Sequence, residues 1–366
     1  MSVPIAIFII PAILFIQIVY IFNSSLEPQC TYLIQPEEPN TEFSSVVPED
    51  PPTTQQRQQP HLENLSLCQS PAEIGAALEI LGSRNESRRA IFFIESSNKG
   101  SITARQICAL ESAAMHNPDA DIYLLLLDPP ENPDLTRDEK MLTVLRHHDN
   151  VRLLAADSAT YYVGTPLQEW SVANRINTSS HPIEHASDIM RVVTLLRYGG
   201  VYLDLDFVIL QSLATLPPNW LSYELNRDLC NGALGFQKGH PMAQMMAHEL
   251  AETFDGSSWA HNGPSMVARV MSRMCGMPES ESGNNCSDVT VLERDKLFPI
   301  GYPGWERYFD GAAGPEVVDS VKHSLGVHVF NYLSHGANVT LGSNQAYSLL
   351  AQKHCPRAYW GCFKFF

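Results

Sequence analysis

Several features that would point to other classes of protein are missing from this chain of 366 residues. No two cysteines have the C-x-x-C spacing of a metal site. Neither a G-x-G-x-x-G nor a P-loop motif is present, so a nicotinamide-dependent enzyme or an ATPase is unsupported. Positive charge is scarce: 24 Lys and Arg face 40 Asp and Glu, giving a formal net charge of −16. This balance argues against a nucleic-acid partner and against electrostatic docking on anionic lipid.

Charged side chains are also absent from residues 3–22, which form an apolar run. About 20 apolar residues are enough to cross a bilayer, and Pro11 and Gln17 do not exclude this. The run exceeds a usual signal-peptide core and no small-x-small cleavage site follows at once. We therefore expect residues 1–22 to be a cytoplasmic tip and signal-anchor transmembrane helix, with a cleaved signal peptide as the alternative. No Lys or Arg precedes Arg57, so flanking charge does not give the orientation.

Cysteines and glycosylation sequons supply the orientation instead. All eight cysteines follow the apolar run, and an even count fits disulfides in an oxidising lumen. Six N-x-S/T sequons also follow it, at Asn23, Asn64, Asn85, Asn177, Asn285 and Asn338. Together they predict a membrane-anchored type II glycoprotein whose bulk lies in the secretory lumen.

Composition divides the lumenal part in two. Residues 23–88 are rich in Pro, Gln, Ser, Thr and Glu and cannot bury a core, so we expect a flexible stem. Residues 89–366 are expected to form the catalytic domain. Its first half alternates strands and helices, at about 90–95, 102–116, 122–127, 136–147 and 151–155. This alternation predicts an α/β fold with a mostly parallel, doubly wound sheet.

The second half of the domain is less regular in pattern. We expect irregular structure over 158–184 and a helix over 187–198. Further helices are expected at about 241–254, 264–274 and 344–354, with a last strand at 326–330.

A D-x-D motif is the strongest functional signal. Asp204 and Asp206 follow the apolar run 201–203, which a Gly199-Gly200 pair separates from the preceding helix. Side chains alternate along a strand, so we expect both carboxylates on one face, at the strand end where such sheets bind ligands. Two hard oxygen ligands predict a Mg²⁺ or Mn²⁺ site; a pair of solvated turn aspartates is the alternative.

The stretch around this motif resembles the animal α-1,4-galactosyltransferase and α-1,4-N-acetylglucosaminyltransferase family of the lactosylceramide type. The shared pattern runs from Ser187 to Asp206 as S-D-x-x-R and then L-x-x-x-G-G-x-Y-L-D-x-D. The similarity covers roughly residues 90–356. Other matching segments follow in family order, namely Ile91–Ser97, Glu111–Ala114, Asn231–Ala233, His261–Pro264, Phe298–Ile300 and His328–Asn331.

This resemblance implies a Rossmann-like GT-A nucleotide-sugar transferase fold in the Golgi membrane. It implies metal-dependent, retaining transfer from a UDP-sugar to a glycosphingolipid in α-1,4 linkage. No residue demands a covalent nucleophile, so front-face displacement is preferred. The sequence leaves the sugar open between galactose, N-acetylgalactosamine and N-acetylglucosamine. An O-glycan acceptor is one alternative, and a non-catalytic lumenal sugar-binding protein or chaperone is another.

The resemblance also implies roles for individual residues. Asp204 and Asp206 would bind Mn²⁺ (or Mg²⁺), and Asp204 would also bind the donor on its ribose side. His328 is a candidate third metal ligand, because a neutral imidazole suits such a cation. A packed core histidine is the alternative for His328. Asp188 and Arg191 would bind the donor sugar and act in catalysis, although residues three apart on a helix also form simple ion pairs.

Four further expectations concern single positions. Asn262 stands where the family usually has Gln and is a candidate catalytic amide, with a structural turn as the alternative. Glu95 ends the first strand and would bind the donor nucleotide, unless it is a surface glutamate. Tyr202 is expected in the core. Cys275 and Cys286, which match two family cysteines, are expected to pair, although each could instead pair elsewhere.

Overall fold

The computed structural model describes residues 81–84, 86–130, 144–168, 172–276, 286–362 and 364–366. The predicted membrane segment and most of the predicted stem lie outside these residues. Within the described part of the chain, no helix is long and apolar enough to cross a membrane.

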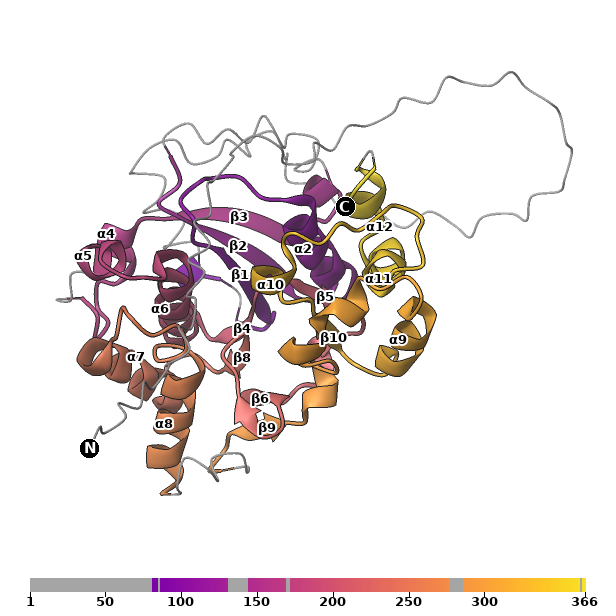
Figure 1. Cartoon of the computed structure of the whole chain (residues 1–366). Coiled ribbons are helices and arrows are strands. Elements are labelled where there is room, and N and C mark those ends of the chain that lie inside the picture. The colour runs from indigo at the N-terminus through magenta and orange to yellow at the C-terminus, as the bar shows by residue number, and fades with distance from the viewer. Residues whose placement is uncertain (1–80, 85, 131–143, 169–171, 277–285, 363) are drawn as a thin grey trace, which may run out of the picture.

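An eight-stranded mixed sheet forms the centre of the molecule (Figure 1). Its strand order is β3-β2-β1-β4-β8-β6-β7, with β9 beside β6. The first four are parallel: β1 (Ala90–Glu95), β2 (Asp121–Leu127), β3 (Val151–Ala156) and β4 (Gly200–Leu203). The others are β6 (Trp220–Leu225), β7 (Asp228–Leu229), β8 (Ala233–Phe236) and β9 (Thr290–Leu292). Antiparallel pairing begins where β8 joins β4, so the predicted parallel sheet describes the first half of the domain.

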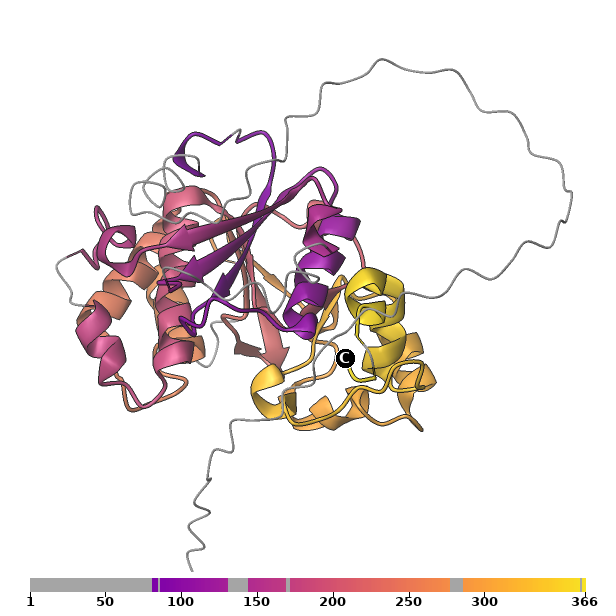
Figure 2. The same ribbon diagram turned by 90° about the horizontal axis from the view of Figure 1, so that it is seen from above.

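Helices cover both faces of the sheet (Figures 1 and 2). Alternate residues of β1 enter two separate cores: Ile91 and Phe93 pack with α2, whereas Phe92 and Ile94 pack with α6. The first face carries α2 (Ala104–His116), α11 (Ala346–His354) and α12 (Pro356–Trp360). The second face carries α6 (Pro182–Tyr198), α7 (Pro241–Thr253) and α8 (Pro264–Cys275). A strand buried on both sides reads as a continuous apolar run, as this one does.

A second, two-stranded sheet brings the C-terminal region to the D-x-D segment. β5 (Phe207–Ile209) pairs antiparallel with β10 (Gly326–His328), and His328 lies opposite Phe207. The predicted strand at 326–330 ends two residues early, because Phe330 has a left-handed backbone (φ 53°). The chain then forms the short helix α10 (Asn331–Ser334). The helix α9 (Gly314–Val321) precedes β10 in the sequence.

The prediction of irregular structure over 158–184 was wrong in part, because turns occupy only 162–168 and 178–181 of the described residues. Two short helices also lie in this range, α4 (Ser158–Tyr161) and α5 (Val172–Asn177), and α6 begins at Pro182 rather than at 187. The Asp157 side chain accepts the Ala159 N–H and starts α4, while Pro182 takes the first-turn position that proline favours. Most of the helix expected at 136–147 lies outside the described residues; 144–146 are helical.

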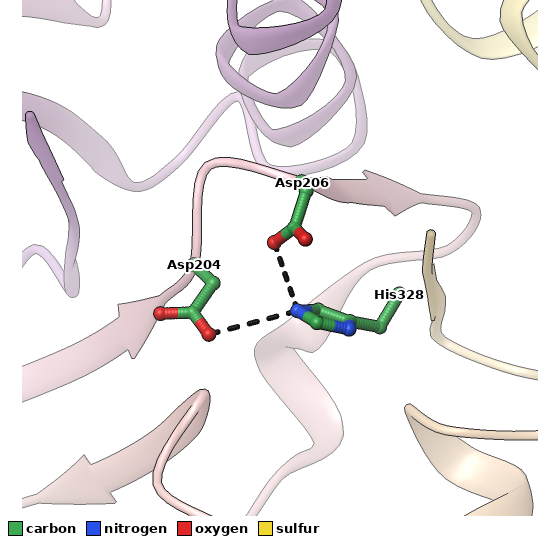
Figure 3. Close-up of side chains that lie close together, drawn as sticks. All are labelled: Asp204, Asp206 and His328. Carbon is green, nitrogen blue, oxygen red and sulfur yellow. Dashed lines mark ion pairs between the residues drawn. The ribbon is translucent and has the colours of Figure 1, made fainter. Parts of the chain in front are cut away.

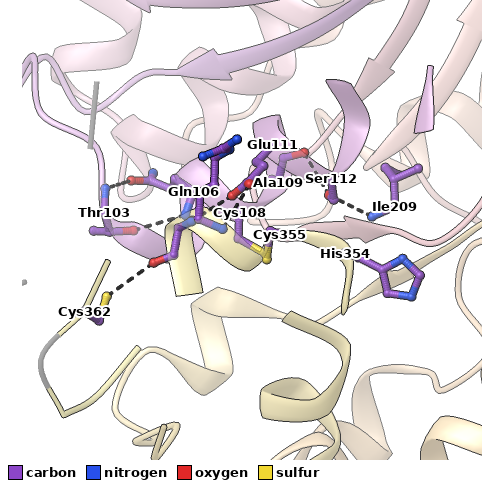
Figure 4. Close-up of a disulfide and its surroundings, with 12 residues drawn as sticks. Thr103, Gln106, Cys108, Ala109, Glu111, Ser112, Ile209, His354, Cys355 and Cys362 are labelled. Carbon is purple, nitrogen blue, oxygen red and sulfur yellow. Dashed lines mark hydrogen bonds between the residues drawn. A yellow bond between two sulfur atoms is a disulfide. The ribbon is translucent and has the colours of Figure 1, made fainter. Parts of the chain in front are cut away.

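Two disulfides connect described cysteines. Cys275 pairs with Cys286 at the end of α8, which confirms the prediction. Cys108 of α2 pairs with Cys355 at the end of α11, a bond that the sequence did not predict (Figure 4). Beside it, the buried Glu111 carboxylate accepts the Ala358 N–H at 2.8 Å, at the N-terminus of α12. Together these contacts fasten α2 to the C-terminal helices.

Candidate active site

The D-x-D motif lies in the turn between β4 and β5. β4 ends at Leu203, so strand alternation is not what brings Asp204 and Asp206 together. The turn is fixed by backbone hydrogen bonds: the Asp204 N–H donates to Gly232 O at 2.9 Å, and the Val329 N–H donates to Asp206 O at 3.0 Å. Both carboxylates consequently point toward β10.

His328 of β10 meets both carboxylates (Figure 3). Its Nε2 lies 2.8 Å from Asp206 Oδ1 and 3.6 Å from Asp204 Oδ2. One ligand atom from each of the three residues lies within 4.8 Å of the others. Two carboxylate oxygens and one imidazole nitrogen suit a divalent cation such as Mn²⁺ or Mg²⁺. The predicted trio is therefore assembled with a spacing and chemistry that fit the ion.

Three phenylalanine rings surround the imidazole. The centroids of Phe207, Phe298 and Phe330 lie 4.8, 5.3 and 4.4 Å from that of His328. Burial among them lowers the pKa of His328, but the charges of Asp206 and Asp204 outweigh this and raise the pKa to about 10. The field that favours a proton on Nε2 favours a metal cation at the same place.

Asp204 is held by groups that are not part of the trio. The Tyr202 hydroxyl donates to its Oδ1 at 2.6 Å, and Arg191 Nη2 lies 3.3 Å from the same oxygen. Gly232 leaves the necessary space, because a Cβ there would lie 2.6 Å from Asp204 Oδ2. Burial would raise the pKa of Asp204, yet Arg191, His328 and the Tyr202 hydroxyl together lower it.

Asp188 and Arg191 are a buried pair, and their side chains are only 9% and 7% exposed. Asp188 Oδ1 accepts from Asn231 Nδ2 at 2.6 Å and lies 3.5 Å from Arg191 Nη2. Arg191 also donates to Asn231 O and to Ser187 Oγ, each at 2.8 Å, and its guanidinium lies 4.5 Å from the Tyr202 ring centroid. The pair thus joins α6 to the D-x-D turn, which a solvated helix ion pair would not do.

Tyr202, Asn231 and Gly232 contribute more than the sequence indicated. Tyr202 is in the core as expected, but its hydroxyl also reaches a metal-ligand candidate. Asn231 and Gly232 lie in a segment that matches the family, but no role was predicted for either residue. Glu224 of β6 is a further carboxylate near the trio. Burial raises the pKa of Glu224, the charge of His328 lowers it, and the charges of Asp204 and Asp206 raise it further. No motif marks Glu224.

Glu95 lies at the end of β1 and is buried. Its Oε1 accepts the Ser97 N–H at 2.9 Å, whereas its buried Oε2 has no hydrogen-bond partner among the described residues. An unpaired buried carboxylate oxygen is costly. It is suited to accept a hydrogen bond from a ligand.

Asn262 lies in the connection between α7 and α8 and is buried. Its Oδ1 accepts the Asp255 N–H at 3.0 Å and its Nδ2 donates to Asp255 O at 2.7 Å. Both polar groups therefore hold the backbone of this connection, as the turn interpretation expected. Its catalytic role stays a prediction.

Comparison with protein families gives two matches. Residues 103–225 match the glycosyltransferase sugar-binding region containing a DXD motif. Residues 235–362 match the alpha 1,4-glycosyltransferase conserved region. Asp204 and Asp206 fall in the first region and His328 in the second.

Curated relatives are similar over most of the domain. The lactosylceramide 4-alpha-galactosyltransferase of Mus musculus is 28% identical over 270 residues, covering 74% of this chain and 75% of the relative. That of Homo sapiens is 28% identical over 271 residues, covering 74% and 76%. The alpha-1,4-N-acetylglucosaminyltransferase of Homo sapiens is 28% identical over 283 residues, covering 74% and 80%.

Solved structures are more distant. The PaToxG glycosyltransferase has a TM-score of 0.40 at 16% identity and covers 55% of this chain and 75% of its own. Mouse xyloside xylosyltransferase 1 has a TM-score of 0.37 at 11% identity and covers 66% and 97%.

Proposed function

Because the chain belongs to the alpha 1,4-glycosyltransferases with a DXD sugar-binding region, we propose that it transfers a hexose or N-acetylhexosamine from a UDP-sugar to a glycosphingolipid. The transfer would form an α-1,4 linkage with retention of configuration, on a GT-A type of fold. The observation that carries this proposal is the convergence of Asp204, Asp206 and His328 next to the buried Asp188–Arg191 pair. Galactose, N-acetylgalactosamine and N-acetylglucosamine are the three donor sugars to compare.

Stabilising the diphosphate leaving group is the main electrostatic task of such a transfer. Asp204, Asp206 and His328 would hold Mn²⁺ or Mg²⁺, which when bound supplies Lewis-acid stabilisation of that leaving group. Tyr202 and Arg191 keep Asp204 ionised and in place. The phenylalanines around His328 exclude water from the imidazole and fix its plane.

Asp188 is the proposed acceptor for hydroxyl groups of the donor sugar. Its Oδ1 is engaged by Asn231, so Oδ2 is the atom that we assign to the sugar. Arg191 orients this carboxylate from the same helix. Glu95 Oε2 is assigned to the donor nucleotide, because it is buried at the strand end and lacks a partner among the described residues.

The cellular location of the protein is also a proposal. We propose a single-pass type II protein of the Golgi membrane, with the anchor in residues 1–22, the stem in 23–88 and the catalytic domain in 89–366. The disulfides Cys108–Cys355 and Cys275–Cys286 support an oxidising compartment.

The function is tested with the full chain purified in mild detergent. UDP release from each of the three UDP-sugars is measured with Mn²⁺ and with a chelator, alone and with lactosyl-lipid or O-glycan acceptors. We expect UDP release with Mn²⁺ and transfer to the lactosyl lipid. No release from any donor would refute the function.

Asp206→Asn is the informative variant in this assay. Its amide oxygen can still accept the Asn331 N–H that now donates to Asp206 Oδ2 at 2.7 Å, so the turn should survive. The lost charge should reduce turnover by about 100-fold or more. Asp319→Asn, on the exposed surface of α9, is the matched control; equal turnover in the two variants would remove the metal assignment.

A further inference from the structure

Two exposed aromatic rings contact each other near the active site. Trp259, in the connection between α7 and α8, is 47% exposed, and Tyr332 of α10 is 59% exposed. Their centroids lie 6.1 Å apart with 37° between the ring planes. Large rings usually bury their apolar faces. A pair that stays open to solvent is therefore suited to a ligand.

Each ring is tied to one half of the site. Tyr332 directly follows Asn331, whose N–H donates to Asp206 Oδ2 at 2.7 Å. Trp259 directly follows Ser258, whose carbonyl lies 3.2 Å from His185 Nε2, and His185 precedes Asp188 on α6 by one turn. One ring thus adjoins a proposed cation ligand and the other adjoins the helix that carries the proposed sugar-binding carboxylate. α10 lies between α6 and the C-terminal helices (Figures 1 and 2).

The segment that carries Trp259 is held in place. Asn262 bonds both the N–H and the carbonyl of Asp255, and His261 Nε2 lies 2.8 Å from Thr253 O. Ser179 Oγ donates to Gly256 O at 3.2 Å from the other side. A ring on a fixed segment loses little conformational entropy when a ligand stacks on it.

We propose that Trp259 and Tyr332 form the platform that binds the terminal β-galactoside of the acceptor, an inference that rests on the proposed function. One face of galactose presents the C–H bonds of carbons 3, 4 and 5, and these pack against the negative face of an aromatic ring. The axial 4-hydroxyl points away from that face. Stacking on the platform therefore directs the 4-hydroxyl away from the rings, and the proposal places the donor on that side.

The geometry serves an α-1,4 transfer. The 4-hydroxyl oxygen forms the new bond to donor C1 while the bond from C1 to the diphosphate oxygen breaks, and the hydroxyl proton leaves with the diphosphate. A glucoside has an equatorial 4-hydroxyl, so the same stacking would not aim it. The two rings are positioning residues, since they touch the acceptor but not the reacting atoms.

The first test separates acceptor binding from donor chemistry. In the full chain, Trp259→Ala and Tyr332→Ala should each raise the KM for lactose or methyl β-galactoside by about fivefold to tenfold. UDP-sugar hydrolysis without acceptor should stay at the wild-type rate, and Trp259→Phe should restore most of the acceptor affinity. Trp360→Ala, which removes a tryptophan that is 56% exposed from α12, is the control.

The second test does not need catalysis. Saturation-transfer NMR with free lactose should show contact in the wild type and in Trp360→Ala, and a loss in Trp259→Ala. This result would support the platform even if no UDP-sugar were hydrolysed. A lack of hydrolysis would instead refute the proposed function. The platform is overturned if Trp259→Ala and Trp360→Ala have the same acceptor KM and lactose binding. The platform is also overturned if UDP-sugar hydrolysis falls as much as transfer. It is overturned as well if Trp259→Ala changes only the binding to lipid vesicles or the self-association of the protein.

Discussion

A single hydroxyl group, that of Tyr202, connects the hydrophobic core to the candidate metal site. It donates to Asp204 Oδ1 at 2.6 Å and lies 3.1 Å from Ser187 Oγ. Groups that orient a metal ligand typically change metal affinity when removed, although they do not touch the ion. The ring of Tyr202 fills the core, so only the hydroxyl needs to be tested.

We expect Tyr202→Phe to weaken Mn²⁺ binding by about 10-fold to 100-fold. The free energy of unfolding should fall by only about 1 kcal/mol, because one hydrogen bond is lost and no cavity is made. Titration calorimetry with Mn²⁺ measures the first effect and urea unfolding the second. Tyr302→Phe, at an exposed tyrosine, is the control; matching Mn²⁺ affinities in the two variants would contradict the role of the hydroxyl.

Gly232 gives an independent test of the same carboxylate. A Cβ at this position would lie 2.6 Å from Asp204 Oδ2, so Gly232→Ala must displace the side chain of Asp204. We expect at least about a tenfold loss of Mn²⁺ affinity. At Gly336 a Cβ would meet nothing within 4 Å, and Gly336→Ala should bind Mn²⁺ like the wild type. Unchanged binding in Gly232→Ala would show that Asp204 is not held where the structure has it.

The sequence predicted the residues that carry charge at the site better than the residues that support them. Asp204 and Asp206 could be proposed because two carboxylates follow an apolar strand, and His328 because the family resemblance implies a metal ligand there. Tyr202 was expected in the core, since an apolar strand surrounds it, and its hydroxyl contact was missed. Side-chain alternation tells which face a residue occupies, but not which distant carboxylate its hydroxyl meets.

At the scale of elements, α7 and α8 are joined by a buried carboxylate. Glu249 of α7 is only 2% exposed. It accepts from Arg269 Nε at 2.6 Å and also pairs with Arg273, both on α8. Burial would raise the pKa of Glu249, but the two arginines outweigh this and lower it. The pair of helices therefore depends on an ionised glutamate.

This dependence predicts how stability changes with pH. Since the folded pKa of Glu249 is lowered, its contribution is complete above the usual glutamate pKa of about 4.3 and is lost as pH falls through the lowered value. We expect Glu249→Gln to lower the free energy of unfolding by about 2 kcal/mol at pH 7. The difference from wild type should shrink below about pH 4.

Thermal unfolding between pH 7 and pH 3 measures this difference. Glu252→Gln, an exposed position on the same helix, should follow the wild type at every pH. A Glu249→Gln deficit that stays constant across this range would show that the ionised form is not what joins the helices.

The longer strands were predictable, whereas two of the shortest were not. β1, β2 and β3 have six or seven residues each and were placed within one residue from their apolar runs. β5 and β9 have only three residues, too few for a period of two to stand out. Their existence depends on pairing with β10 and β6, which are distant in sequence.

At the scale of the whole molecule, two disulfides differ mainly in the length of chain that they close. Cys275–Cys286 has a sequence separation of 11, and Cys108–Cys355 one of 247. Restricting a longer loop removes more entropy from the unfolded chain. Replacing Cys108 and Cys355 with serine should therefore lower the free energy of unfolding by about 5–6 kcal/mol, and replacing Cys275 and Cys286 by about 3 kcal/mol.

Guanidinium unfolding of the two double variants tests this order. Peptide mapping without reduction comes first, to establish that each variant keeps the other bond. Cys230→Ala serves as the control, because Cys230 is a free thiol in the structure. A larger loss from the short loop than from the long one would contradict the entropic account.

The Cys108–Cys355 bond can form only late in the synthesis of the chain, because its two cysteines are far apart in the sequence. At about 5–20 residues per second, Cys286 is synthesised roughly half a second to two seconds after Cys275, whereas Cys355 follows Cys108 by about 12 to 50 seconds. Throughout that interval the thiol on α2 has no native partner, and Cys230, Cys275 and Cys286 are made before the correct one. A chain that stops short of residue 355 can never close this bond. Every unfinished copy of the chain therefore carries an unpaired Cys108 thiol, which is joined to Cys355 only when α2 and the C-terminal helices have docked.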